Sequence, residues 1–168
     1  MPDRNMIKAA RDLLALSRAR GLKIAAAESC TGGLLMATLT EIPGSSDVVD
    51  RGFVTYSNQS KQQLLGVPAR VLEKHGAVSR QTAQAMARGA LARSPAHLTV
   101  AITGVAGPGG GTKAKPIGLV HIAAAARRGR LIHRACKFGD IGRVKVREKS
   151  VLQALKMLKS LAVKIKPR

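Results

Sequence analysis

Two polar side chains in this sequence have the type and the setting for nucleophilic catalysis. Ser29 lies in the run AESCTGG at residues 27–33, between a short apolar segment and an apolar pattern with helical spacing. That order predicts a strand, a tight turn and a helix, with Ser29 in the turn beside backbone N–H groups that favour negative charge. Because a serine hydroxyl needs a base, and because a desolvated lysine readily loses its proton, Lys61 is the candidate partner. The pair predicts a serine/lysine hydrolase.

The turn around Ser29 also admits other interpretations. Alanine and threonine flank the serine where the nucleophile elbow of α/β-hydrolases has glycines, and a glycine stands where an S-x-x-K motif has its lysine. From local sequence, Ser29 could serve only as a helix cap. Cys30 is a rival nucleophile, and Glu28 could either contact a substrate or hold the turn in place.

Residues at the end of the next predicted strand belong to the same candidate site. Tyr56 ends that strand and Lys61 follows it, which puts both near the carboxyl ends of strands, where open α/β sheets bind ligands. The Tyr56 hydroxyl could relay or orient a proton between Ser29 and Lys61. Asn58 could cap a turn or, alternatively, contact the substrate.

A glycine-rich loop at residues 104–111 offers a second binding element. It holds five glycines in eight residues, which costs backbone entropy unless bare N–H groups approach a ligand closely. The loop is not a Walker A motif and leads into a predicted strand rather than a helix, so a tight connection between strands is its alternative role. Gly104 and Gly107 are candidate contacts to an oxyanion or a phosphate, and Thr103 precedes them at the end of a strand.

Two arginines open the last predicted helix. Arg143 and Arg147 are four residues apart, so they share one helix face. A guanidinium group binds phosphate through two parallel hydrogen bonds. Arg143 is therefore the candidate for contact with a substrate phosphate.

Hydrophobic periodicity predicts the elements that position these residues. Apolar residues at helical spacing predict long helices at 6–20, 32–40, 79–93 and 142–163, the first capped by Asn5, and short helices after Ser57 and at Pro68. Alternating or continuous apolar runs predict strands at 23–27, 48–56, 98–103, 117–126 and 130–138, the last two forming a hairpin. This order predicts an α/β fold, with a mixed sheet covered by helices on both faces, in one domain spanning residues 1–168 with a basic tail at 164–168.

Taken in order, the motifs of this chain resemble those of the CinA C-terminal domain family, the nicotinamide mononucleotide (NMN) deamidases. The matching segments are AESCTGG at 27–33, IPGSS at 42–46, YSN at 56–58 with Lys61, LGVP at 65–68, HGAVS at 75–79, TGVAGPGGGT at 103–112 and KPIG at 115–118. The resemblance implies a three-layer α/β/α sandwich. Larger members carry a separate N-terminal domain, which we expect to be absent here.

The resemblance also implies a reaction, the hydrolysis of the NMN carboxamide to nicotinic acid mononucleotide and ammonia without a cofactor. Lys61 would take the proton of Ser29, directly or through Tyr56, and Ser29 would attack the carboxamide carbon. Backbone N–H groups at residues 31–33 would stabilise the oxyanion. The family has an arginine just after Gly-Asp, whereas two residues intervene here. The expected substrate-binding residues are Thr31, Gly32, Gly33, Asn58, Thr103, Gly104, Gly107 and Arg143.

Composition bounds the partners of the chain. Its formal net charge of +20, from 29 basic and 9 acidic residues, would attract polyanions nonspecifically and would steer an anionic mononucleotide toward a pocket. Since only three residues are aromatic, no platform for base stacking exists, and nucleic-acid binding is expected to be nonspecific at most. The two cysteines are far apart and no secretory signal is seen, which predicts a cytoplasmic protein. The four histidines lack the spacing of metal ligands, so we expect no metal. No apolar stretch is long enough to predict a membrane span.

We also expect a homo-oligomer whose ligand is a small nucleotide. Two other functions are open at this stage. One is a non-enzymatic binding protein associated with competence or DNA damage, which the basic charge would suit. The other is an amidase that acts on a different pyridine or nucleotide amide. Ammonia release from candidate amides separates the enzymes from the binding protein.

Overall fold

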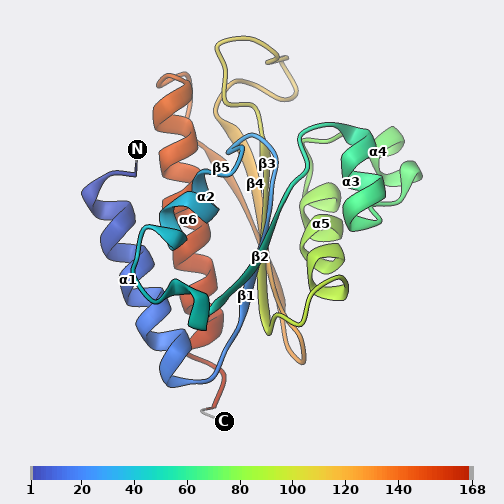
Figure 1. Ribbon diagram of the computed structural model, residues 1–168. Coiled ribbons are helices and arrows are strands. Elements are labelled where there is room, and N and C mark those ends of the chain that lie inside the picture. The colour runs from blue at the N-terminus through green and yellow to red at the C-terminus, as the bar shows by residue number, and fades with distance from the viewer. Residues whose placement is uncertain (1, 167–168) are drawn as a thin grey trace.

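A mixed five-stranded sheet forms the centre of the protein. The structure is a computed structural model that describes residues 2–166 (Figure 1). The strands are β1 (Ile24–Glu28), β2 (Val49–Val54), β3 (Leu98–Gly104), β4 (Leu119–Ala126) and β5 (Leu131–Lys137), in the spatial order β2-β1-β3-β4-β5. β1 pairs in parallel with β2 and β3, whereas β4 runs antiparallel to both β3 and β5.

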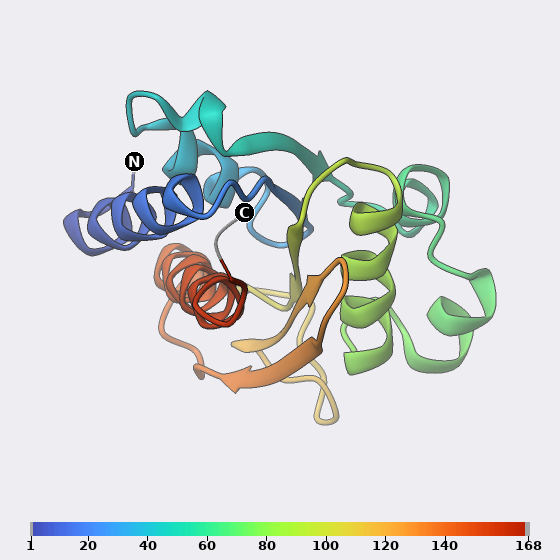
Figure 2. The ribbon, with the colours of Figure 1, turned by 90° about the horizontal axis from the view of Figure 1, so that it is seen from below.

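Helices cover both faces of this sheet. One layer contains α1 (Arg4–Ala19), α2 (Leu34–Thr40) and α6 (Arg143–Ala162), and the other contains α3 (Asn58–Leu65), α4 (Ala69–His75) and α5 (Arg80–Ala92) (Figure 1). Seen from below, α1 and α6 lie side by side (Figure 2). The predicted mixed sheet and three-layer α/β/α sandwich are therefore confirmed. Within residues 2–166, no helix is long and apolar enough to cross a membrane.

Small residues in the central strands let both helix layers approach closely. All five residues of β1 are buried, and alternate alanines face opposite sides: Ala26 belongs to the core under α1 and α6, and Ala27 to the core under α5. Ile102 and Ala101 divide in the same way on β3. This double burial explains why both strands read as continuous apolar runs.

The structure corrects three local predictions. Asp3, not Asn5, caps α1, since its carboxylate accepts a hydrogen bond from the Met6 N–H at 2.7 Å. α2 begins at Leu34, later than predicted, because the two preceding glycines have positive φ angles of 56° and 95°. A short 3₁₀ helix at Ser45–Asp47 was not predicted. Residues 167–168 of the predicted basic tail lie outside the described residues.

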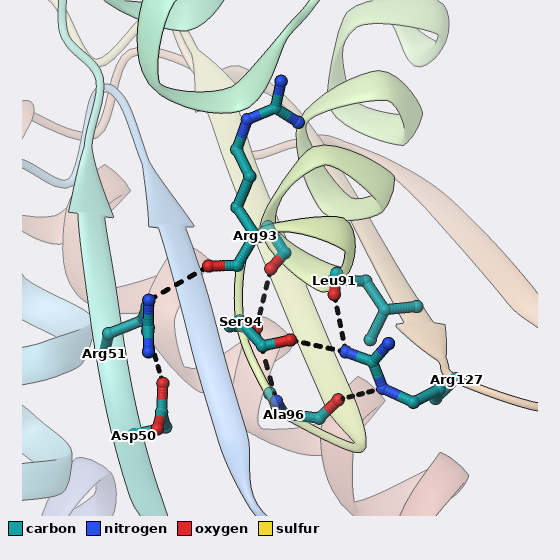
Figure 3. Close-up of polar contacts among 8 residues, drawn as sticks. Asp50, Arg51, Leu91, Arg93, Ser94, Ala96 and Arg127 are labelled. Atoms are coloured by element: carbon teal, nitrogen blue, oxygen red, sulfur yellow. Dashed lines mark hydrogen bonds and ion pairs between the residues drawn. The ribbon is translucent and has the colours of Figure 1, made fainter.

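Arginine side chains tie β2 and the turn after β4 to the end of α5 and to the segment before β3. Arg127, in the turn after β4, donates to the backbone carbonyls of Ala96 at 2.8 Å and of Leu91 and Ser94 at 2.6 Å each (Figure 3). Arg51 donates to the Arg93 carbonyl at 3.0 Å (Figure 3). Cations at a helix C-terminus satisfy its free carbonyl groups. These contacts fix the end of α5 against the sheet.

Candidate active site

Ser29 is the first residue beyond β1, at the carboxyl end of the parallel part of the sheet. Its N–H donates to the carbonyl of Ile102 on β3 at 3.0 Å, so the sheet still positions its backbone. The chain then turns sharply: the Gly32 N–H donates back to the Ser29 carbonyl at 3.0 Å, with Gly32 in the left-handed region. The Ser29 side chain is largely buried, with 8% of its surface exposed.

Glu28 holds this turn against α2. Its side chain is fully buried, and the carboxylate accepts from the N–H groups of Gly33 and Leu35 at 3.1 Å each and of Met36 at 2.9 Å. These N–H groups open the helix and lack intrahelical partners. Of the two roles left open for Glu28, the structure shows the structural one. Ser29 does not cap α2, because Gly33 occupies the N-cap position without a side-chain cap.

Lys61 reaches Ser29 from α3. Ser57 caps that helix by accepting from the Ser60 N–H, and the Lys61 side chain points inward with none of its surface exposed. Its Nζ lies 3.0 Å from the Ser29 Oγ, 2.7 Å from the Thr55 carbonyl and 3.3 Å from the Tyr56 carbonyl. The sequence-predicted pair is thus in direct contact.

The surroundings of Lys61 make its ammonium group easier to deprotonate than that of an exposed lysine. Burial lowers the pKa of Lys61 from 10.5 to about 8, and the smaller effect of Cys30 opposes it. An ammonium group has three N–H donors, which the two carbonyls and the serine oxygen accept. A neutral amine has two N–H donors for the same carbonyls, and its lone pair then faces the Ser29 hydroxyl. The geometry therefore accommodates both protonation states.

Cys30 is poorly suited to act as a nucleophile. Its thiol is buried, with 6% of the residue exposed, and burial raises the pKa of the thiol to about 11. The thiolate is the reactive form of cysteine, so this residue stays protonated at neutral pH. Ser29 remains the better placed of the two neighbours.

Two of the three backbone N–H groups expected to face an oxyanion, those of residues 31–33, are already engaged. The N–H groups of Gly32 and Gly33 already donate, to the Ser29 carbonyl and the Glu28 carboxylate respectively, so neither is free for an oxyanion. No oxygen atom within residues 2–166 accepts a hydrogen bond from the backbone N–H groups of Cys30 and Thr31. Those two N–H groups are the donors that the turn leaves available beside Ser29.

Arg143 joins three segments that are distant in the sequence. Its Nη1 donates to the Gly107 carbonyl at 2.9 Å, and its Nη2 donates to the Tyr56 hydroxyl at 3.1 Å. The structure therefore brings together Tyr56, the glycine-rich loop and the start of α6. The predicted position of the Tyr56 hydroxyl between Ser29 and Lys61 is not seen: the hydroxyl contacts Arg143, and only the backbone carbonyl of Tyr56 contacts Lys61.

Three further predicted residues have mainly structural contacts. The Thr103 hydroxyl is buried and donates to the Ala77 carbonyl at 2.8 Å. A Cβ on Gly104 would come within 2.7 Å of the Leu119 carbonyl oxygen, so close packing requires glycine there. Asn58 is exposed at the start of α3, while Ser57 is the cap. Neither the Thr103 nor the Asn58 side chain makes a hydrogen bond to the Ser29 side chain, whose contact among the described residues is with Lys61.

The sequence of the chain matches a known protein family over most of its length. The family model described as the CinA C-terminal domain matches residues 6–162. The chain belongs to the CinA C-terminal domain family. A CinA-like protein from Parasynechococcus marenigrum is 49% identical over 148 residues, which are 88% of this chain and 35% of that protein. The chain thus spans about a third of the length of this curated relative.

Solved CinA structures agree with this fold over their whole length. The competence/damage inducible protein CihA from Agrobacterium tumefaciens superposes with a TM-score of 0.95 at 52% identity, covering 96% of this chain and 98% of that one. A CinA superfamily protein from Klebsiella pneumoniae gives a TM-score of 0.90 at 32% identity, with 96% and 99% coverage.

From the sequence of this CinA domain, no role was assigned to Arg147, which contacts the Ser29 turn. Arg147 donates from Nη2 to the Thr31 carbonyl at 2.7 Å, directly behind the Ser29 turn. Its Nε and the Thr31 hydroxyl are both buried without a hydrogen-bond partner among the described residues. The four-residue spacing from Arg143 was the signal that could have found it. The two backbone carbonyls that accept from Lys61 could not be predicted from the sequence, because every residue has a backbone carbonyl.

Proposed function

We propose that this CinA domain is an amidohydrolase that converts NMN and water into nicotinic acid mononucleotide and ammonia. One observation carries the proposal: the Ser29 Oγ lies 3.0 Å from the amine of a fully buried lysine. A buried lysine with a lowered pKa can act as a general base, and the adjacent serine is then the nucleophile.

The acylation step uses Ser29, Lys61 and the turn between them. The neutral Lys61 amine takes the Ser29 proton while Oγ bonds to the carboxamide carbon. The oxyanion that forms accepts from the N–H groups of Cys30 and Thr31, which are preorganised by the turn. The Lys61 ammonium then gives its proton to the departing nitrogen, so ammonia leaves and Ser29 carries the acyl group.

Deacylation repeats these transfers with water as the nucleophile. Lys61, neutral again, takes a proton from a water molecule that attacks the acyl carbon. The ester bond breaks, and the Lys61 ammonium returns its proton to the Ser29 oxygen. Nicotinic acid mononucleotide is released and the enzyme is restored, so no redox partner or cofactor enters the balance.

Arg143 supports a nucleotide substrate. Its two hydrogen bonds, to Gly107 and Tyr56, leave other guanidinium N–H groups for a phosphate. The Tyr56 ring beside it is 62% exposed and offers an aromatic surface to a pyridine ring. In this arrangement Tyr56 orients the substrate, and the proton passes directly between Ser29 and Lys61.

An ammonia-release assay tests the proposal. The purified full chain is given NMN, nicotinamide riboside or nicotinamide at equal concentration. We expect the fastest release from NMN, because only NMN carries the phosphate. If ammonia is released faster from nicotinamide riboside or nicotinamide than from NMN, that amide and not NMN is the substrate. No release from any of them, together with tight DNA binding that survives physiological salt, would favour a binding protein.

A further inference from the structure

A second cavity lies between α4, the start of α5 and β4. Its volume is about 560 Å³, within the range of small-molecule sites. The residues that line it include Lys74, Arg80 and Lys115, and none of them carries a carboxylate. It shares no lining residue with the contacts of Ser29, Lys61 and Arg143.

The wall of this cavity is held rigidly. The Lys115 amine donates to the His75 carbonyl, and a Cβ on Gly76 would come within 2.6 Å of that amine. The Gly76 carbonyl accepts from the hydroxyls of Ser79 at 3.0 Å and Thr82 at 2.7 Å. Lys115 is therefore a positioned cation rather than a freely moving surface lysine.

A histidine pair lies at the same place on the sheet. His121 also lines the cavity, and its Nδ1 is 2.9 Å from the Nε2 of His133, with the rings stacked at 5.2 Å. Burial, then His133 and Lys115, lower the pKa of His121 to about 4, and burial and Arg80 lower the pKa of His133. Since Lys115 and Arg80 disfavour further positive charge on the pair, both imidazoles are neutral at pH 7.

We propose that this cavity is a second anion site, which binds a small ligand carrying at least two phosphate charges. Three permanent cations line one cavity without an acidic partner to neutralise them, and anions bind where such charge is concentrated. Lys74 and Arg80 are exposed, and Lys115 is held by its contact with the His75 carbonyl. This binding is independent of whether Ser29 hydrolyses NMN.

Calorimetric titration of the full chain with inorganic diphosphate, at constant ionic strength, tests the site. The variants are Arg80→Gln, Lys115→Met and the double substitution. Arg88→Gln is the control, because Arg88 is exposed on the same helix outside the cavity. We expect saturable binding by the wild type, at least a tenfold loss of affinity in the double variant, and no change in Arg88→Gln.

Imidazole NMR gives a second readout that a general charge effect would not produce. Bound diphosphate should raise the pKa of His121 and His133, because it offsets the field of Lys115 and Arg80. Arg80→Gln alone remains informative if Lys115→Met does not fold, since the Arg80 side chain is exposed. The proposal is wrong if binding is absent, is unchanged in Arg80→Gln and the double variant, or falls equally in Arg88→Gln.

Discussion

Basic side chains donate to backbone carbonyls at both ends of the sheet, and at the carboxyl ends one of them, Lys61, also contacts a serine hydroxyl. At the amino end of β3, Arg127 donates to three backbone carbonyls (Figure 3). Arg20 likewise donates to carbonyls at the end of α6. At the carboxyl ends, Lys61 contacts a serine hydroxyl, and Arg147 keeps a buried Nε without a partner among the described residues.

This difference separates stabilising from reactive cations. A buried polar group without a partner costs free energy, so its presence needs an explanation such as a bound ligand or a catalytic role. The amino end has its arginine donors committed to carbonyls, and we expect substitutions there to change the free energy of unfolding. The carboxyl end keeps Lys61 beside Ser29, and we expect substitutions there to change the rate.

Lys61→Ala should have the largest effect, a loss of at least about a thousandfold in kcat for ammonia release from NMN, because it removes the base. Lys61→Arg should fail as well, since a guanidinium group does not give up its proton near neutral pH. The Ser29→Ala, Lys61→Ala double variant should be little worse than either single variant. An active Lys61→Arg enzyme would remove Lys61 from the role of base.

The pH dependence should follow the lysine. The reactive form is the neutral amine, and the pKa of Lys61 is lowered to about 8, so the ammonium form predominates below that pH. We therefore expect kcat/KM to rise about tenfold per pH unit up to about pH 8 and then to level off. A profile that stays flat between about pH 6 and 9 would contradict a lysine base.

Arg143→Ala should raise KM for NMN about ten- to a hundredfold, the equivalent of about 1.5–3 kcal/mol for one charge-assisted contact. Nicotinamide riboside is the control substrate, because it lacks the phosphate, and its KM should change little. If KM rises equally for both substrates, Arg143 does not contact the phosphate, and the loop at 104–111 becomes the candidate for that contact.

Arg127→Ala should leave kcat and KM unchanged within about twofold and lower the free energy of unfolding by about 1–2 kcal/mol, since its carbonyl partners become solvated. Arg128→Ala is the matched control, because Arg128 makes no hydrogen bond within the described residues. Urea denaturation measures the free energy of unfolding of both variants. Equal stability of the two variants would show that the Arg127 contacts do not stabilise the protein.

Most of the fold follows from patterns that the sequence displays directly. Continuous apolar residues mark β1 and β3, and helical spacing marks α5 and α6, because burial on two faces or on one stripe imposes those periods. Boundaries were less predictable. α2 starts later than predicted because Gly32 and Gly33 turn the backbone. Asp and Asn are equally good N-cap residues, so the sequence could not show that Asp3 rather than Asn5 caps α1.

The sequence predicted which residues form the candidate site better than it predicted how those residues contact one another. Motifs pointed to Ser29, Lys61 and Arg143, and the structure brings the first two together. The direction of the Tyr56 hydroxyl was predicted wrongly, because its partner Arg143 is distant in the sequence. Likewise, only the folded turn shows that the Gly32 and Gly33 N–H groups are already occupied.

The most direct test of the account is the rate of ammonia release from NMN by Ser29→Ala. The substitution removes one largely buried oxygen and leaves Lys61 its contacts with the carbonyls of Thr55 and Tyr56. We predict a loss of at least about a thousandfold in kcat, with a urea midpoint equal to that of the wild type. A folded variant that keeps more than about a tenth of wild-type activity would contradict covalent catalysis by Ser29.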